Sequence, residues 1–266
     1  SILILFSPNG KDPYLSFKQF QLEPKETSAR AGDKALAPLA SNFENSAGQE
    51  KVYASYQAVD VIAVDKESST VQDLNKAEEP FEIDNNFLIP LGNSDTAEEG
   101  GLILSYHQSL NSLIRAYVTS TEEGINANYL EEFWSENDNF PEGSYLTLNE
   151  GSIGSVLACE NPYQDFEPLT LVGESGDKYL VLGWAEELLL VEKDSCSPMP
   201  LSISAEPGDT VFVAPLGELM EGQLVGINEE TGFITASYEF VNEITEENFP
   251  FGEVMLEFSN AESTEE

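Results

Sequence analysis

The chain contains a single histidine, His107, and this limits the catalytic chemistry it can perform. A Ser-His-Asp or Cys-His arrangement needs an imidazole as general base. His107 lies among polar residues in LILSYHQSLNSLIRAYVTS, a context typical of a surface or partly buried imidazole. No serine sits in G-x-S-x-G, since GSIGS at 151–155 shares only its composition. No catalytic residue is therefore predicted.

Further catalytic or cofactor-binding patterns are also missing from the sequence. Neither G-x-x-x-x-G-K-[ST] nor G-x-G-x-x-G occurs, so nothing predicts a phosphate cradle. A glycosidase needs two carboxylates on either side of a sugar, and 49 acidic residues give no basis for choosing a pair. The sequence therefore predicts a non-enzymatic protein without a cofactor.

One acidic segment and two cysteines remain as candidates for chemistry of a different kind. ENDNFPEG at 136–143 offers the oxygen ligands that Ca²⁺ prefers, but it lacks the EF-hand pattern and is more typical of a solvated turn. We therefore leave Ca²⁺ open and nominate no metal ligand. Cys159 and Cys196 lie 37 positions apart, without zinc-site spacing. Two small buried residues are the favoured interpretation, and a disulfide is the alternative.

Charge is distributed very unevenly along the chain. The formal net charge is -38, of which residues 1–76 carry -2 and residues 77–266 carry -36. Such asymmetry is a signal of interaction. A surface this poor in bases disfavours direct nucleic-acid binding, although an acidic DNA mimic is one alternative. The bases in the leading part are predicted to contact another protein: Lys11, Lys18, Lys25, Arg30 and Lys34.

Short apolar runs bounded by turn residues dominate the chain and predict strands. After ILILF and KVYASYQAVDVIAV near the start, the runs are FLIPL, SYLTL, PLTLV, YLVLGW, ELLLVE, TVFVAP, QLVGI, FITASYEF and EVMLEF. The fold class predicted is mainly β, as an antiparallel sandwich or barrel with one or two short helices.

The clearest hairpin is GQLVGINEETGFITASYEF, where NEETG ends in a glycine that can adopt a positive φ. In the strand that follows, period-two alternation places Ile234, Ala236, Tyr238 and Phe240 on one face. The sequence therefore predicts a strand with one buried and one wet face.

Three segments are predicted to depart from strand structure. Helical spacing of Tyr106, Leu110, Leu113 and Tyr117 predicts a helix over 105–117, and NYLEEFWSE predicts a further helical turn. Low periodicity predicts a loosely structured arm over 21–50. No internal repeat is evident. The predicted division is 1–76 as strand plus arm, 77–258 as an acidic β domain with a split near 145 left open, and 259–266 as a disordered tail.

No apolar run is long enough to cross a bilayer, and the start of the chain lacks the features of a signal peptide. The expectation is a protein kept without export, or one whose signal was removed.

One segment resembles the Gly-Asp-Thr-Val strand starts and Val-Gly-Ile hairpins of phage virion β-proteins, particularly head-decoration components. Its sequence is PGDTVFVAPLGELMEGQLVGINEETGFITA. The resemblance implies a β-rich, capsid-bound and often trimeric protein without enzymatic activity.

The expected function is a non-enzymatic structural or interaction role, as an exterior virion component that docks through its N-terminal region. Its expected partners are other virion or assembly proteins and further copies of itself, with no membrane contact. Two different functions stay open: an extracellular acidic β-module that binds Ca²⁺ or carbohydrate, with Trp134 and Trp184 as sugar-stacking candidates, and a DNA-mimic inhibitor. Localisation is accordingly expected on the virion or, alternatively, outside the cell.

Overall fold

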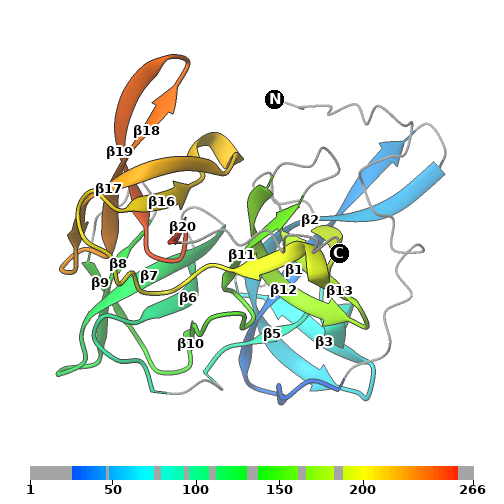
Figure 1. Cartoon of the computed structure of the whole chain (residues 1–266). Coiled ribbons are helices and arrows are strands. Elements are labelled where there is room, and N and C mark those ends of the chain that lie inside the picture. The colour runs from blue at the N-terminus through cyan, green and yellow to red at the C-terminus, as the bar shows by residue number, and fades with distance from the viewer. Residues whose placement is uncertain are drawn as a thin grey trace.

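The structure is a computed structural model that describes residues 26–45, 48–74, 79–92, 96–107, 112–130, 137–160, 166–182 and 188–256. Within these residues the chain forms strands and three short 3-10 helices, and no α-helix occurs among them. The mainly β prediction is confirmed. The strands form four antiparallel sheets that pack together (Figure 1).

The first two sheets are built from consecutive strands. Sheet 1 comprises β1 Lys34–Asn45, β2 Gly48–Val64, β3 Ser68–Asp73, β4 Phe81–Asp84 and β5 Ile89–Pro90, with the 3-10 helix η1 Asn85–Phe87 before β5. Sheet 2 comprises β6 Leu102–His107, β7 Ser112–Ser120, β8 Ile125–Tyr129, β9 Asn137–Phe140 and β10 Tyr145–Thr147.

The last two sheets follow in the same manner. Sheet 3 comprises β11 Val156–Glu160, β12 Phe166–Ser175, β13 Lys178–Leu182, β14 Leu188–Glu192 and β15 Cys196–Pro198, with η2 Lys193–Ser195 before β15. Sheet 4 comprises β16 Thr210–Val213, β17 Met220–Asn228, β18 Phe233–Phe240, β19 Glu243–Pro250 and β20 Val254–Met255, with η3 Pro215–Gly217 after β16.

All four sheets share one strand order among the described residues. Four strands form a meander, and the fifth returns to pair with the first, as in β4-β3-β2-β1-β5. The fourth and fifth strands are the two edges, so the sheets are not closed into barrels. We call these units repeats 1 to 4, at residues 29–91, 97–148, 151–199 and 205–256.

The repeats also share a turn. A glycine with positive φ stands two residues before the first strand of each: Gly32, Gly100, Gly154 and Gly208. Its N–H donates to a carbonyl of the second strand, at 2.6–2.9 Å, in the pairs Gly32 to Val61, Gly100 to Val118, Gly154 to Leu171 and Gly208 to Leu224. The next position of each second strand begins a bulge in the ladder with the third strand. The same kink therefore recurs four times.

The exits of the repeats are similar too. In repeats 1 to 3 the residue after the fifth strand donates its N–H to the first residue of the first strand: Leu91 to Lys34, Leu148 to Leu102 and Met199 to Val156. First strands begin at 102, 156 and 210, which is a period of 54 residues, whereas repeat 1 is longer because its β1–β2 hairpin is extended. The chain therefore contains a structural repeat that was not evident from the sequence.

The predicted helix over 105–117 was also wrong. Its described residues, 105–107 and 112–117, lie in the paired strands β6 and β7, in which Tyr106 pairs with Leu113. Residues 102–105 are all buried because sheet 2 is covered on both faces. A strand buried on both faces carries consecutive apolar residues, and such a run lacks the alternation that distinguishes a strand from a helix.

The described part of the predicted arm over 21–50 is largely strand. Only residues 26–33 are coil or turn, after which β1 begins and pairs with β2. Small residues fill a tight core here, since Ala35 and Ala37 are fully buried. Residues 128 and 129 of the second predicted helical turn end β8, and its residues 131–136 lie outside the described residues, as do ILILF and the tail 259–266.

The four repeats pack around one shared core. A single cluster of buried side chains includes Leu36 of repeat 1, Leu104 of repeat 2, Val172 of repeat 3 and Ile234 of repeat 4.

Residues 76 and 77 fall between β3 and β4, which are neighbours in sheet 1, so the repeats divide the chain at other positions. In the described residues we find no helix with the length and apolar character to span a bilayer.

Candidate functional site

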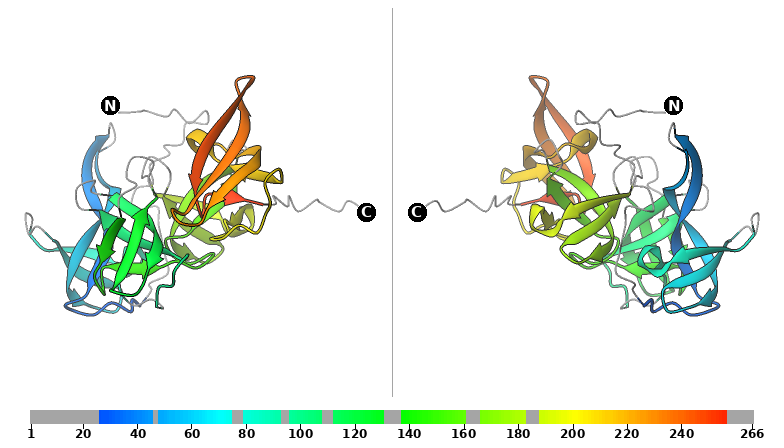
Figure 2. Two further views of the ribbon diagram at one scale, coloured as in Figure 1. Left: turned by 90° about the vertical axis from the view of Figure 1, so that its left-hand side faces the viewer. Right: turned by 90° about the vertical axis from the view of Figure 1, so that its right-hand side faces the viewer.

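The most exposed apolar feature of the described structure is the hairpin of β18 and β19. The two strands pair along their whole length, but β17 accompanies β18 only as far as Tyr238, which pairs with Gly222. Residues 239–244 therefore form a two-stranded ribbon that extends beyond the sheet, and it projects from the rest of the molecule (Figures 1 and 2).

The tip of this ribbon is apolar on both faces. Phe240, Val241 and Ile244 are 41%, 75% and 82% exposed. Phe240 continues the core-facing series of β18, whereas Ile244 pairs with Glu239 on the opposite face. Ile234, Ala236 and Tyr238 are buried as predicted, but Phe240 is exposed because the strand runs past the end of the core. Isolated exposed apolar residues are common, but three on one projecting tip make this tip a candidate interaction surface.

The turn at the tip has unusual backbone geometry. Val241 and Asn242 both have positive φ, of 51° and 63°, as a two-residue type I′ turn requires. Asn tolerates this region, but a β-branched residue such as Val is strained there. A residue that costs stability while exposing an apolar side chain is the kind of outlier that points to a binding role.

The stem of the ribbon is acidic. Glu239, Glu243 and Glu246 are exposed and Glu247 is half-buried, where it accepts a hydrogen bond from the hydroxyl of Tyr238. No Lys or Arg follows Lys193 anywhere in the chain. The apolar tip is thus carried on a negatively charged stem, and a surface that receives it should be apolar at its centre and basic at its rim.

A second surface lies on sheet 2, where four asparagines occupy directly paired positions on β8 and β9. Asn137 donates to Oδ1 of Asn128 at 3.1 Å and to the hydroxyl of Thr119 at 2.9 Å, and Asn139 donates to Oδ1 of Asn126 at 3.4 Å. We call these five residues the amide grid. The grid fastens edge strand β9 and presents uncharged donors and acceptors to solvent.

The acidic segment that was considered for Ca²⁺ contributes to this sheet. Residues 137–140 form β9, where the carboxylate of Asp138 accepts a hydrogen bond from the Tyr129 hydroxyl at 3.0 Å. Burial and, secondarily, Asp138 raise the pKa of Tyr129 to about 12. Within the part of the chain that the structure describes, no group of three or more potential metal-ligating side chains occurs.

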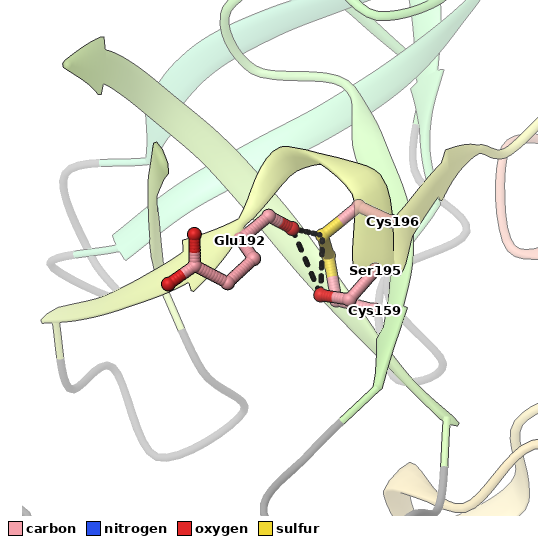
Figure 3. The surroundings of a disulfide bond; sticks show 4 residues. All are labelled: Cys159, Glu192, Ser195 and Cys196. Atoms are coloured by element: carbon pink, nitrogen blue, oxygen red, sulfur yellow. Dashed lines mark hydrogen bonds between the residues drawn. A yellow bond between two sulfur atoms is a disulfide. The ribbon is translucent and has the colours of Figure 1, made fainter. Parts of the chain in front are cut away.

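Cys159 and Cys196 form a disulfide between β11 and β15, which corrects the favoured interpretation of two unpaired cysteines. The two residues are directly opposite each other in the ladder of the first and fifth strands of repeat 3. Figure 3 shows that Ser195 stands beside the bridge, where its hydroxyl donates to the Glu192 carbonyl at 2.8 Å. Sequence separation alone gave no sign of this pairing.

The remaining residues singled out from sequence are dispersed. His107 ends β6, half-buried, with its ring 5.0 Å from that of Tyr129. Arg30 and Lys34 are exposed at the start of repeat 1, and Lys11, Lys18 and Lys25 lie outside the described residues. The basic contact surface thus stays a prediction.

No protein-family model matches the chain, and a search of curated proteins found no match. The surfaces described above are therefore the basis on which a function can be proposed.

Proposed function

We propose that this chain is a non-enzymatic structural or interaction protein that joins a larger assembly in an oxidising environment. The observation that carries the proposal is the projecting ribbon of β18 and β19, with its strained, apolar tip at residues 240–244. The assembly favoured by the sequence resemblance is the exterior of a virion. In that setting the ribbon and the basic side chains of the leading region are contact surfaces, and the remaining acidic surface maintains solubility.

The disulfide supports the environment named in the proposal. Cross-links such as Cys159–Cys196 persist in secreted proteins and on virion or cell surfaces, and they are rare in the reducing cytosol. An extracellular site and a virion site are both compatible with this chemistry.

The test is to follow the chain through fractionation of particles from its source. We expect it to sediment with particles at a fixed stoichiometry, in the oxidised form. The double variant F240S–I244S should lose this association, because the apolar contact is removed while no core side chain is changed. Ile62→Ser is the matched control, since Ile62 is also exposed, at 47%, but lies in repeat 1.

The proposal fails if the wild-type chain remains free in the reduced cytosolic fraction. It also fails if F240S–I244S stays on the particles at the wild-type stoichiometry, since the ribbon would then contribute nothing to assembly.

The amide grid favours a second candidate function, an extracellular module that binds carbohydrate. Asparagine side chains offer a paired donor and acceptor, which match the vicinal hydroxyls of a sugar. A glycan array probed with the wild type and with N137A–N139A decides this: binding that is lost in the variant supports it, and absence of binding rejects it. Binding through the grid should also persist at high salt, because its side chains are uncharged.

Neither a Ca²⁺-dependent module nor a DNA mimic gains comparable support from the geometry. A Ca²⁺-dependent module predicts a higher melting temperature in millimolar Ca²⁺, which a chelator would reverse. The DNA mimic predicts a carboxylate stripe along a helix, and the described residues form strands without an α-helix.

A further inference from the structure

We infer that residues 1–25 of this chain are the segment that docks on the β18–β19 ribbon, either within one molecule or between two copies. This inference rests on the proposed function, because it takes the ribbon to be a docking surface and names its occupant. Residues 1–25 lie outside the described residues, and their sequence supplies the chemistry that the ribbon lacks.

Charge is the first argument. Residues 233–250 carry four glutamates and no base, whereas residues 1–25 carry Lys11, Lys18 and Lys25 against Asp12 and Glu23. The ribbon is therefore net -4 and the leading segment net +1. Opposite charge favours encounter and fixes orientation between two surfaces. The same -4 disfavours a second ribbon or an anionic lipid surface as the occupant.

Apolar complementarity is the second argument. The leading segment opens with ILILF and continues with Leu15, Phe17 and Phe20. The ribbon tip exposes Phe240, Val241 and Ile244 on both of its faces. Joining the two sets would remove apolar surface from water on both partners, which is the main driving force of association.

The edge position of β19 is the third argument. In the strand order of sheet 4, β19 is the outermost strand beyond β18, and it presents eight residues of ladder. An extended segment can add to such an edge as a further strand, with backbone hydrogen bonds for affinity and alternate side chains for specificity. The ILILF run, which predicts a strand, suits that mode of binding.

The experiment uses the full chain with a photo-cross-linking phenylalanine analogue at position 241, and mass spectrometry to find the attachment site. We expect attachment within residues 1–25, and suppression of it by an excess of a synthetic peptide of residues 1–25. The matched control carries the analogue at Glu229, in the exposed β17–β18 turn of the same repeat. The mass of the product tells whether the contact closes within a chain or links two copies.

A charge-reversal variant, K11E–K18E–K25E, should reduce the cross-link yield about tenfold, because like charges would then face the stem. Thermal melting checks that each variant is folded. The inference is overturned if the analogue at position 241 labels other parts of the chain, a second ribbon or added phosphatidylcholine vesicles. It is likewise overturned if charge reversal leaves the yield unchanged.

Failure here is distinguishable from failure of the proposed function. Attachment to a different assembly protein overturns the assignment of residues 1–25 but leaves the ribbon as a docking surface. Retention of F240S–I244S on particles overturns the docking role itself.

Discussion

Repeats 3 and 4 have the same strand order, the same positive-φ glycine and the same bulge, and their first strands begin 54 residues apart. Their bulges nevertheless have different surroundings. In repeat 3 Val172 is buried and Gly173 lies against the backbone of Asn86 in repeat 1. In repeat 4 Val225 is 40% exposed and Gly226 has open space around it. The bulge of repeat 3 therefore packs inside the protein, whereas the bulge of repeat 4 faces solvent.

The two repeats also fasten their short fifth strands by different means. In repeat 3 a disulfide joins β15 to β11. In repeat 4 the strand β20 follows Glu253, whose carboxylate pairs with Arg115 of repeat 2. Only two or three residue pairs hold the fifth strand against the first strand of its sheet, so this short pairing needs a further stabilising link. Both repeats thus pair the fifth strand with the first, but the additional link is a disulfide in repeat 3 and an ion pair in repeat 4.

The largest effect is expected from removing the covalent reinforcement. The disulfide closes a loop between residues 37 apart, for which chain entropy corresponds to about 4 kcal/mol. C159A–C196A should lower the free energy of unfolding by about that amount, as measured in urea. Reductant should have a similar effect on the wild type and none on the variant. An unchanged midpoint would show that this short pairing does not depend on the cross-link.

A substitution at the contact of repeat 4 with repeat 2 should lower the free energy of unfolding by nearly as much. Gly232 has a φ of 77°, and a Cβ there would overlap the ring of Tyr117. Gly232→Ala should therefore cost about 3 kcal/mol of unfolding free energy, from backbone strain and overpacking together. Gly226→Ala is the control, because that position is open, and it should change stability by less than about 1 kcal/mol. Equal effects of the two changes would contradict the assignment of a tight contact.

The ionic reinforcement should contribute less than the covalent one. Glu253→Gln leaves the partly buried Arg115 without its charged partner, and we expect a loss of about 2 kcal/mol in thermal or urea unfolding. Glu192→Gln removes the exposed pair with Lys178 and should lower the free energy of unfolding much less than Glu253→Gln does, because water screens this pair. High salt should reduce the difference in unfolding free energy between these two variants. A larger loss at Glu192 would reverse the proposed ranking.

The smallest effect concerns the exposed ribbon and has the opposite sign. Val241→Asn should raise the free energy of unfolding by about 1 kcal/mol, because Asn accepts the positive φ at lower cost. Val225→Asn, at an exposed site whose φ is negative, should give no such gain. If the variant is more stable and also loses its place on particles, strain at the tip has been retained for binding.

Strands were predictable from the sequence where alternation is clean, and they were not where charge or burial obscures it. FITASYEF was predicted as a strand and matches the bounds of β18. Its partner EITEENFP was not predicted, because three glutamates over eight residues conceal a strand whose exposed edge tolerates them. Alternation predicts which way Phe240 points, but it cannot predict where the core beneath a strand ends.

The repeat and the disulfide were missed for a related reason. The repeats share a topology that depends on a few positions, chiefly the glycine before the first strand and an apolar residue before the bulge. Different side chains fill the remaining positions, so sequence similarity is low. Cys159 and Cys196 become neighbours only through the return of the fifth strand to the first, which is a tertiary property.

That return has a consequence for how such a chain can arise and be re-engineered. Because the entrance and the exit of a unit emerge next to each other, each unit is a nearly closed circuit of backbone. A gene segment that encodes one unit can therefore be duplicated in tandem without a change in the backbone fold of the adjoining units. The same proximity should allow a unit to be opened at a hairpin and rejoined through its natural ends.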